Sequence, residues 1–252
     1  MTTSTETEFE LPDASQLAAA FVDLARSVND GKDMVEVFSM LAERCVGVLS
    51  VAACGILVID PMGELEVIGS SNHSAHLLDL FQVQNVEGPC LLCCRTGEAV
   101  IDTELSASGQ WPGFSLAARE QGYLAVYAVP LAARGVVVGA LNLFAHEPIR
   151  DDEIVVAQAL ADAATIALLQ ADPHEDALVV TRRLHMVVEE RNTIEQAKGV
   201  LSQRFSINAE EAFVQLRRAG ERTGTRLVDV AMSVVTRDNS YDAARLLANP
   251  IE

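Results

Sequence analysis

The sequence predicts an α+β domain with an antiparallel sheet and flanking helices, followed by a smaller all-α unit of three helices, the first of them a coiled-coil helix. Three observations lead to this fold class. Two pairs of β-rich runs are each joined by a short turn that contains glycine, helical patterns precede and follow these pairs, and the balance of charge changes near residue 182.

The chain is long enough for two domains with separate cores, and its charge divides in the same way. The formal net charge is −18 over 252 residues, which by itself argues against a nucleic-acid partner. However, residues 182–252 hold eleven Lys or Arg against ten Asp or Glu, whereas the preceding residues hold seven against 26. The charge of the second domain is therefore compatible with binding to nucleic-acid phosphates.

The first domain begins with helical patterns at 14–29 and 32–49. Two β-rich runs, 52–60 and 64–71, then form a hairpin, and a helix is expected at 74–81. The section that follows, up to residue 122, has no pattern that assigns structure.

The second pair of β-rich runs, 123–133 and 135–145, forms another hairpin that turns near Arg134 and Gly135. Residues 150–170 follow as a long amphipathic helix. Its first turn is acidic, which the helix dipole favours.

Two stretches resemble GAF domains of actinobacterial regulators: "LLDLFQVQNVEGPCLLCCRTGEAVIDTEL" (77–105) and "VPLAARGVVVGALNLFA" (129–145). The resemblance implies a sensor with terminal helices on one face of the sheet and a ligand pocket on the other. Its effector is a small molecule that the sequence does not identify. The section from Phe81 to Asp102 is expected to border this pocket, with Phe81, Cys90, Cys93 and Asp102 as candidate pocket residues.

Helical patterns also cover the second domain. Beyond Asp172-Pro173, residues recur at steps of three and four as in a coiled-coil seam, and the apolar ones, Ala177, Val180, Leu184 and Val187, predict a homodimer through residues 174–201. Asn208 and Glu211 form a capping box for a second helix, which ends near Gly224. A short third helix follows.

The segments "RNTIEQAKGVL" and "AEEAFVQLRRAGERTGTRLVDVAMSVV" resemble the ANTAR domain, an RNA-binding antitermination module of bacterial regulators. The resemblance implies RNA hairpins as partners and no chemistry by the protein. The expected RNA-binding residues are Arg191, Gln196, Lys198, Gly199, Arg204, Arg217, Arg218, Arg222 and Arg226. Gly220 stands where alanine is usual and predicts a softer second helix.

Other interpretations remain open. The arginines are also typical of a solvated helix face that pairs with nearby glutamates, and the short helices allow a DNA-binding regulator. A third possibility is a ligand-sensing or redox-sensing dimer without nucleic acid. Cys90, Cys93 and Cys94 with His73 and His76 are possible metal or redox residues, but buried thiols are the commoner outcome and no metal site is assigned.

The predicted boundaries are a tail (1–13), the GAF-like sensor (14–171), a helical linker (172–181), the ANTAR unit (182–243) and a second tail (244–252). The acidic start lacks the features of a secretory signal, and no run of 18 apolar residues appears. The predicted location is therefore cytoplasmic. No arrangement of residues predicts an enzyme.

Overall fold

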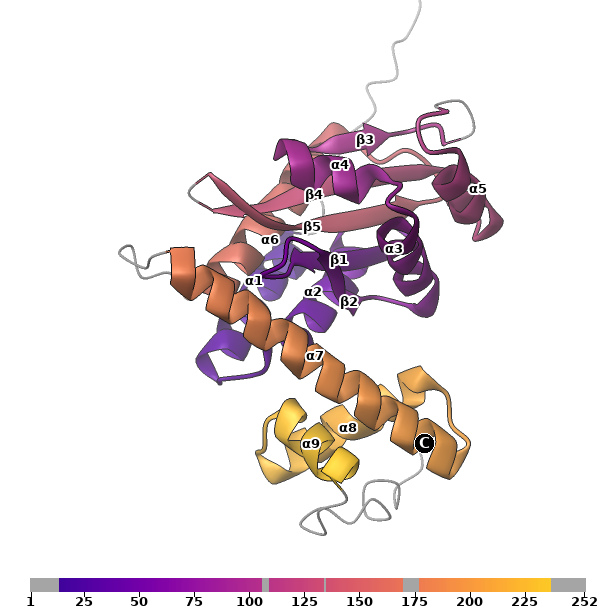
Figure 1. Ribbon diagram of the computed structural model, residues 1–252. Coiled ribbons are helices and arrows are strands. Elements are labelled where there is room, and N and C mark those ends of the chain that lie inside the picture. Colours follow the sequence, from indigo (N-terminus) through magenta and orange to yellow (C-terminus); the bar gives the residue numbers. More distant parts are fainter. Residues whose placement is uncertain (1–13, 106–108, 134, 170–176, 237–252) are drawn as a thin grey trace, which may run out of the picture.

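The computed structural model describes residues 14–105, 109–133, 135–169 and 177–236 (Figure 1). A five-stranded antiparallel sheet is the centre of the first domain, in the order β2-β1-β5-β4-β3. Its strands are β1 (Ala53–Ile59), β2 (Leu65–Ser70), β3 (Val100–Asp102), β4 (Ala125–Ala133) and β5 (Val136–Ala145). The two predicted hairpins are confirmed as β1–β2 and β4–β5, and β1 pairs with β5 to join them.

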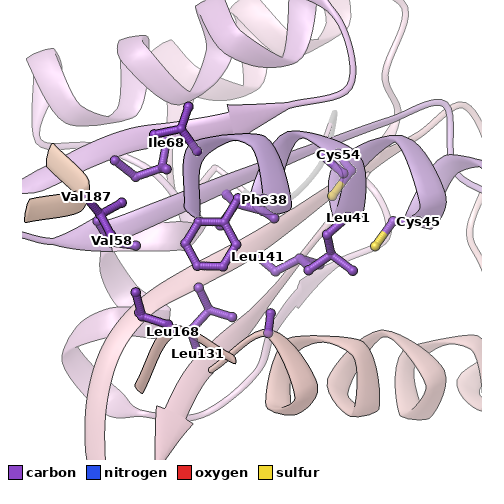
Figure 2. Close-up of a cluster of buried hydrophobic side chains, with 14 of the residues drawn as sticks. Phe38, Leu41, Cys45, Cys54, Val58, Ile68, Leu131, Leu141, Leu168 and Val187 are labelled. Atoms are coloured by element: carbon purple, nitrogen blue, oxygen red, sulfur yellow. The ribbon is translucent and has the colours of Figure 1, made fainter. Parts of the chain in front are cut away.

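One face of the sheet packs against α2 (Met34–Val48) and α6 (Asp151–Leu169), and α1 (Ala14–Asn29) packs on these two helices. These helices and the strands form the largest hydrophobic cluster, in which Phe38, Leu41 and Leu141 are fully buried (Figure 2). Because alternate residues of β5 point to opposite faces, Leu141 and Leu143 enter this cluster, whereas Asn142 and Phe144 point to the other face.

The other face carries α3 (His73–Asn85), α4 (Pro89–Thr96) and α5 (Pro112–Glu120). The helix predicted at 74–81 is confirmed and is longer than expected, whereas α4, β3 and α5 lie in the section to which the sequence assigned no structure. They have eight, three and nine residues, which is too short for a clear periodicity. Proline in the first turn of α4 and of α5 is the local signal that marks their starts.

The second domain consists of α7 (Ala177–Phe205), α8 (Ala209–Thr223) and α9 (Leu227–Thr236). Its core is formed by Ile194, Leu201, Leu216, Val230 and other residues that are fully buried between these helices. The predicted capping box is present: Asn208 Oδ1 accepts from the Glu211 amide at 2.8 Å, and Glu211 Oε2 accepts from the Asn208 amide at 3.1 Å.

Helix α7 joins the two domains, and its first half packs on the sensor. Leu184 and Val187 are 7% and 3% exposed and belong to the same hydrophobic cluster as the core residues of the first domain. Two of the four expected dimer-seam residues are thus already covered within one chain. Ala177 and Val180 lie in α7, but their side chains fall outside the described residues. The homodimer remains a prediction.

Gly220 has a steric role that the sequence did not indicate. A Cβ atom at this position would lie 2.8 Å from the backbone oxygen of Thr225, because the chain turns tightly between α8 and α9. The turn also places the Thr225 amide 3.1 Å from the Gly220 oxygen, as a hydrogen bond. The glycine therefore permits the close approach of the α8–α9 turn.

Candidate nucleic-acid interface and sensor site

The expected RNA-binding residues fall into two groups that differ in what surrounds them. Arg218 and Arg222 are exposed and share one face of α8 at a spacing of four residues. Neither forms an ion pair with any residue in the described part of the chain. Arg204 is also exposed, with its guanidinium 5.4 Å from the centre of the Phe205 ring. Gln196 and Gly199 are exposed on α7.

A second group of arginines contacts the sensor. Arg226 Nη1 lies 3.4 Å from Asp33 Oδ1, and Arg217 Nη1 lies 3.5 Å from Glu43 Oε1. These distances are long for direct hydrogen bonds, and both arginines are partly solvated, so each pair contributes little alone. Their importance is positional, since they turn two basic residues of the ANTAR unit towards acidic residues of the sensor.

Arg191 makes a closer contact with the sheet. Its Nη1 donates to the backbone oxygen of Ile68 at 2.9 Å. Ile68 is the extra residue of a bulge in β2, because the pairing with β1 passes from Gly69 directly to Val67. A bulged residue at a sheet edge has no strand partner, and Arg191 satisfies its carbonyl group.

The link between the domains centres on Asp33, which is 3% exposed. Its Oδ2 accepts from the backbone amide of Val228, in the first turn of α9, at 2.8 Å. Asp33 stands directly before α2 but makes no side-chain bond to that helix. A residue at the start of one helix thus caps another helix, 195 residues further along the chain.

Three carboxylates surround the single guanidinium of Arg226. Asp33 and Glu190 lie 3.4 Å and 3.6 Å from Nη1, and Asp229 lies 3.3 Å from Nε. Burial raises the pKa of Glu190 to about 7, and Asp33 adds to this effect while Arg226 opposes it. Burial also raises the pKa of Asp33, against the lowering effect of the Val228 amide and Arg226.

Lys198 and Gly199 differ in their surroundings. The ammonium group of Lys198 pairs with Glu195 at 2.8 Å and lies 5.8 Å from the centre of the Phe213 ring. Gly199 faces open space, since a Cβ atom there would meet nothing within 4 Å. No contact within the described chain therefore requires a glycine at this position.

In the sensor, hydrogen bonds of the Glu87-Gly88-Pro89-Cys90 motif connect α3, α4 and α5. Glu87 Oε1 accepts from the amides of Gly113 and Phe114 at 2.8 and 3.2 Å, in the first turn of α5. Gln82 Oε1 accepts from the Cys90 amide at 3.0 Å. Gly88 has φ of 147°, and a Cβ atom there would lie 2.2 Å from Gln82 Oε1. Glycine is thus required in this motif.

A buried carboxyl group lies beneath the same helices and was missed by sequence reasoning. Asp79 is fully buried, and its Oδ1 accepts from Asn142 Nδ2 at 2.7 Å and from Gln82 Nε2 at 3.2 Å. Burial raises the pKa of Asp79 to about 8, although both hydrogen bonds lower it. Gly55 on β1 makes room, because a Cβ atom there would lie 1.7 Å from Asp79 Oδ2. A glycine inside a strand was the available signal.

The four expected pocket residues are distributed between two hydrophobic clusters on this face. Cys90 and Cys93 are fully buried in the cluster with Leu57 and Val67, and burial raises the pKa of the Cys93 thiol to about 12. Phe81 is half-buried in the other cluster, with Phe114 and Trp111.

Asp102, the fourth, is on β3, where Oδ1 accepts from the Glu104 amide at 3.0 Å. The role of these residues in a ligand pocket stays a prediction. The amide of Cys90 donates a hydrogen bond to Gln82 Oε1. Gln82 lies almost two helical turns from His76 along α3. Among the described residues, no group of three or more His, Cys, Asp or Glu is arranged to hold a metal ion.

Comparison with known proteins bears on both domains. The GAF domain model matches residues 31–169, which is more than half of the chain. The chain belongs to the GAF domain family. The ANTAR domain model matches residues 182–235, so the GAF domain is followed by an ANTAR domain. This order of domains is that of GAF-ANTAR regulators, and it is typical of signal-responsive regulators rather than enzymes.

Solved structures are similar to the first domain. The GAF domain of a phosphoenolpyruvate-protein phosphotransferase from Coxiella burnetii is 17% identical, has a TM-score of 0.50, and covers 63% of this chain and 96% of its own. The GAF domain of the phosphoenolpyruvate-protein phosphotransferase from Acinetobacter is 15% identical and has a TM-score of 0.49. The match covers 65% of this chain and 99% of that domain. At such identities the first likeness shows the fold alone.

A free methionine-R-sulfoxide reductase from Neisseria meningitidis, solved with its substrate, is 14% identical, with a TM-score of 0.45 and coverage of 69% and 88%. The curated proteins include no match to this chain. Within the ranges that the structure describes, no helix is both long and apolar enough to span a membrane.

Proposed function

We propose that this GAF-ANTAR protein binds RNA hairpins through its ANTAR domain and promotes transcription antitermination under control of the GAF domain. A bound hairpin withholds one strand from the competing terminator stem, so occupancy alone is sufficient. Arginine and lysine neutralise phosphates, and exposed polar side chains such as Gln196 contact unstacked loop bases. The protein acts as a cytoplasmic regulator without catalysis.

The observation that carries this proposal is the division of the basic residues. Arg204, Arg218 and Arg222 are exposed on the ANTAR domain, whereas Arg191, Arg217 and Arg226 contact the backbone or acidic groups of the sensor, Arg226 with its side chain 51% exposed. We call the second arrangement the docked state. In it, RNA meets only part of the basic surface and also meets the acidic sensor, which disfavours binding. A signal that loosens the contacts of Asp33 and Glu43 exposes the remaining arginines.

The test compares a labelled RNA hairpin with a DNA hairpin of the same sequence, using the full chain. The double variant Arg218→Gln/Arg222→Gln is expected to weaken RNA binding about tenfold. It is also expected to make the salt dependence of binding shallower, because fewer phosphate contacts form and fewer counterions are released on binding. Arg95→Gln/Arg119→Gln, at exposed positions of α4 and α5, is the charge-matched control and leaves RNA binding unchanged. Equal affinity for the DNA hairpin favours the DNA-binding alternative. No saturable binding to either hairpin contradicts the proposal.

A further inference from the structure

A cavity of about 450 Å³ lies between the two domains. His73 and His76 of α3 line it from the sensor, and Arg191 and Lys198 of α7 line it from the ANTAR domain. Its volume is within the range of small-molecule sites, which commonly form where domains meet. This cavity is separate from the expected GAF pocket, whose candidate residues lie elsewhere in the fold and do not line it.

His76 lies near two cations and the carboxylate that they share. Glu195 Oε1 accepts from both Arg191, at 2.7 Å, and Lys198, at 2.8 Å, so two cations share one carboxylate. The pKa of His76 is lowered to about 4 by burial and then by Arg191, with Lys198 and His73 adding to the effect and Glu195 opposing it. His76 is therefore neutral at neutral pH and lies near two cations, while the carboxylate of Glu66 also acts on Arg191.

Two other acids line the cavity, but both have different surroundings. Glu43 lies 3.5 Å from Arg217 and so has a cationic partner of its own. Glu210 is exposed in the first turn of α8, where the helix dipole offsets its charge. Among the described residues, neither of these two carboxylates forms an ion pair with Arg191 or Lys198.

The wall of the cavity formed by α8 includes apolar residues. Phe213 and Val214 line it, both half-buried, and the Lys198 ammonium group lies near the Phe213 ring. The cavity therefore combines cationic donors with an apolar surface, which suits a ligand that has an acidic group and a short hydrocarbon or aromatic part.

We propose that this cavity binds a small organic anion, with its carboxylate or phosphate group between His76, Arg191 and Lys198 and its apolar part against Phe213 and Val214. Because the ligand contacts residues of both domains, it stabilises the docked state. This regulatory consequence rests on the proposed function, whereas the binding site itself does not.

The site is tested with the full chain by NMR titration of the histidine rings. The probes are benzoate, its neutral analogue benzamide, and phenyl phosphate as the alternative acid group. Benzoate or phenyl phosphate is expected to bind saturably and to raise the pKa of His76, since the anion adds negative charge beside the ring. Benzamide is expected to cause no such change. Absence of saturable binding by both anions up to about 20 mM, or equal binding of benzamide, overturns the proposal.

Variants with opposite expected effects guard against a loss caused by misfolding. Lys198→Gln is expected to weaken anion binding about tenfold, and Arg182→Gln, an exposed change on the same helix, serves as the control. Glu195→Gln removes the carboxylate that competes for both cations, so anion binding is expected to become several-fold tighter. Unchanged binding in both cavity variants overturns the site.

RNA binding is measured separately at saturating anion. The proposal predicts weaker binding to the hairpin in the presence of the anion, because the docked state is favoured. Anion binding in a chain that binds no RNA supports the site and contradicts the proposed function. Anion binding that leaves RNA affinity unchanged overturns the regulatory consequence.

Discussion

The carboxylate of Asp33 accepts a hydrogen bond from the Val228 amide at 2.8 Å, and this bond ties the start of α2 in the sensor to the start of α9 in the ANTAR domain. Free amides at a helix start require an acceptor, so the sensor supplies part of the local stability of α9. Arg226 then lies beside the same carboxylate. One side chain thus joins helix capping to the position of an RNA-binding candidate.

The first prediction concerns this cap. Asp33→Ala removes the acceptor, and we expect a loss of about 1 kcal/mol in the local stability of α9, with roughly fivefold faster hydrogen exchange at the Val228 amide. Glu98→Ala, an exposed acidic residue of the sensor, is the control. Unchanged exchange at Val228 in the Asp33 variant would mean that the cap has no energetic role.

The second prediction concerns pH. The pKa of Glu190 is raised to about 7 in the docked state, so this state binds a proton more tightly than an undocked one. The raised pKa of Asp33 acts in the same direction. Docking is therefore expected to be strongest below the ordinary pKa of glutamate and to weaken as pH rises to about 7.

Hydrogen exchange of α9 across this pH range, corrected for intrinsic rates, measures the effect. Glu190→Gln imitates the protonated side chain, so its docked state is expected to be less sensitive to pH and stronger than the wild type above neutrality. Glu189→Gln, the exposed neighbour, should behave as the wild type. A Glu190 variant with the full pH response contradicts the assignment.

The third prediction concerns Asp79, whose pKa of about 8 means that it is mostly protonated at neutral pH. The carboxyl group stabilises the fold in its neutral form, so its contribution is lost as pH rises from its ordinary pKa through about 8. Asp79→Asn is expected to remove this part of the pH dependence of unfolding. Asn142→Asp, which places a second carboxyl group beside the first, is expected to destabilise the domain by about 3 kcal/mol or more. Identical pH dependence in wild type and Asp79→Asn would falsify this account.

The fourth prediction compares two glycines in helices. Gly199→Ala meets nothing within 4 Å and is expected to stabilise the protein by about 0.5–1 kcal/mol through helix propensity. Gly220→Ala gains the same propensity but places Cβ 2.8 Å from the Thr225 oxygen, so net destabilisation is expected. Thermal unfolding of the two variants decides between them. A stabilised Gly220→Ala variant would support the interpretation of a merely softer helix.

Local patterns explain how much of the fold was predictable. The hairpins, the long helices and the Asn208–Glu211 capping box depend on residues close in sequence, and all are present. Helices α4 and α5 were not predicted, because they are short and depend on contacts such as that between Glu87 and the amide of Gly113. Those contacts join residues that are distant in sequence.

The candidate site was less predictable than the fold. The sequence identified the arginines, but helical spacing gives only which of them share a face. It does not show that Arg217 and Arg226 meet Glu43 and Asp33, since these partners belong to another domain. Which arginines contact the sensor is therefore a property of the tertiary structure.

The central claim is that the docked sensor withholds basic residues from RNA. The most direct measurement is the affinity of the full chain for one RNA hairpin across a salt series, for wild type and for Asp33→Ala/Glu43→Gln. The account predicts several-fold tighter binding by the double variant and a salt dependence steeper by about one phosphate contact or more, because Arg217 and Arg226 become available. The contrary result is a folded double variant whose α9 exchanges freely while its RNA affinity and salt dependence equal those of the wild type.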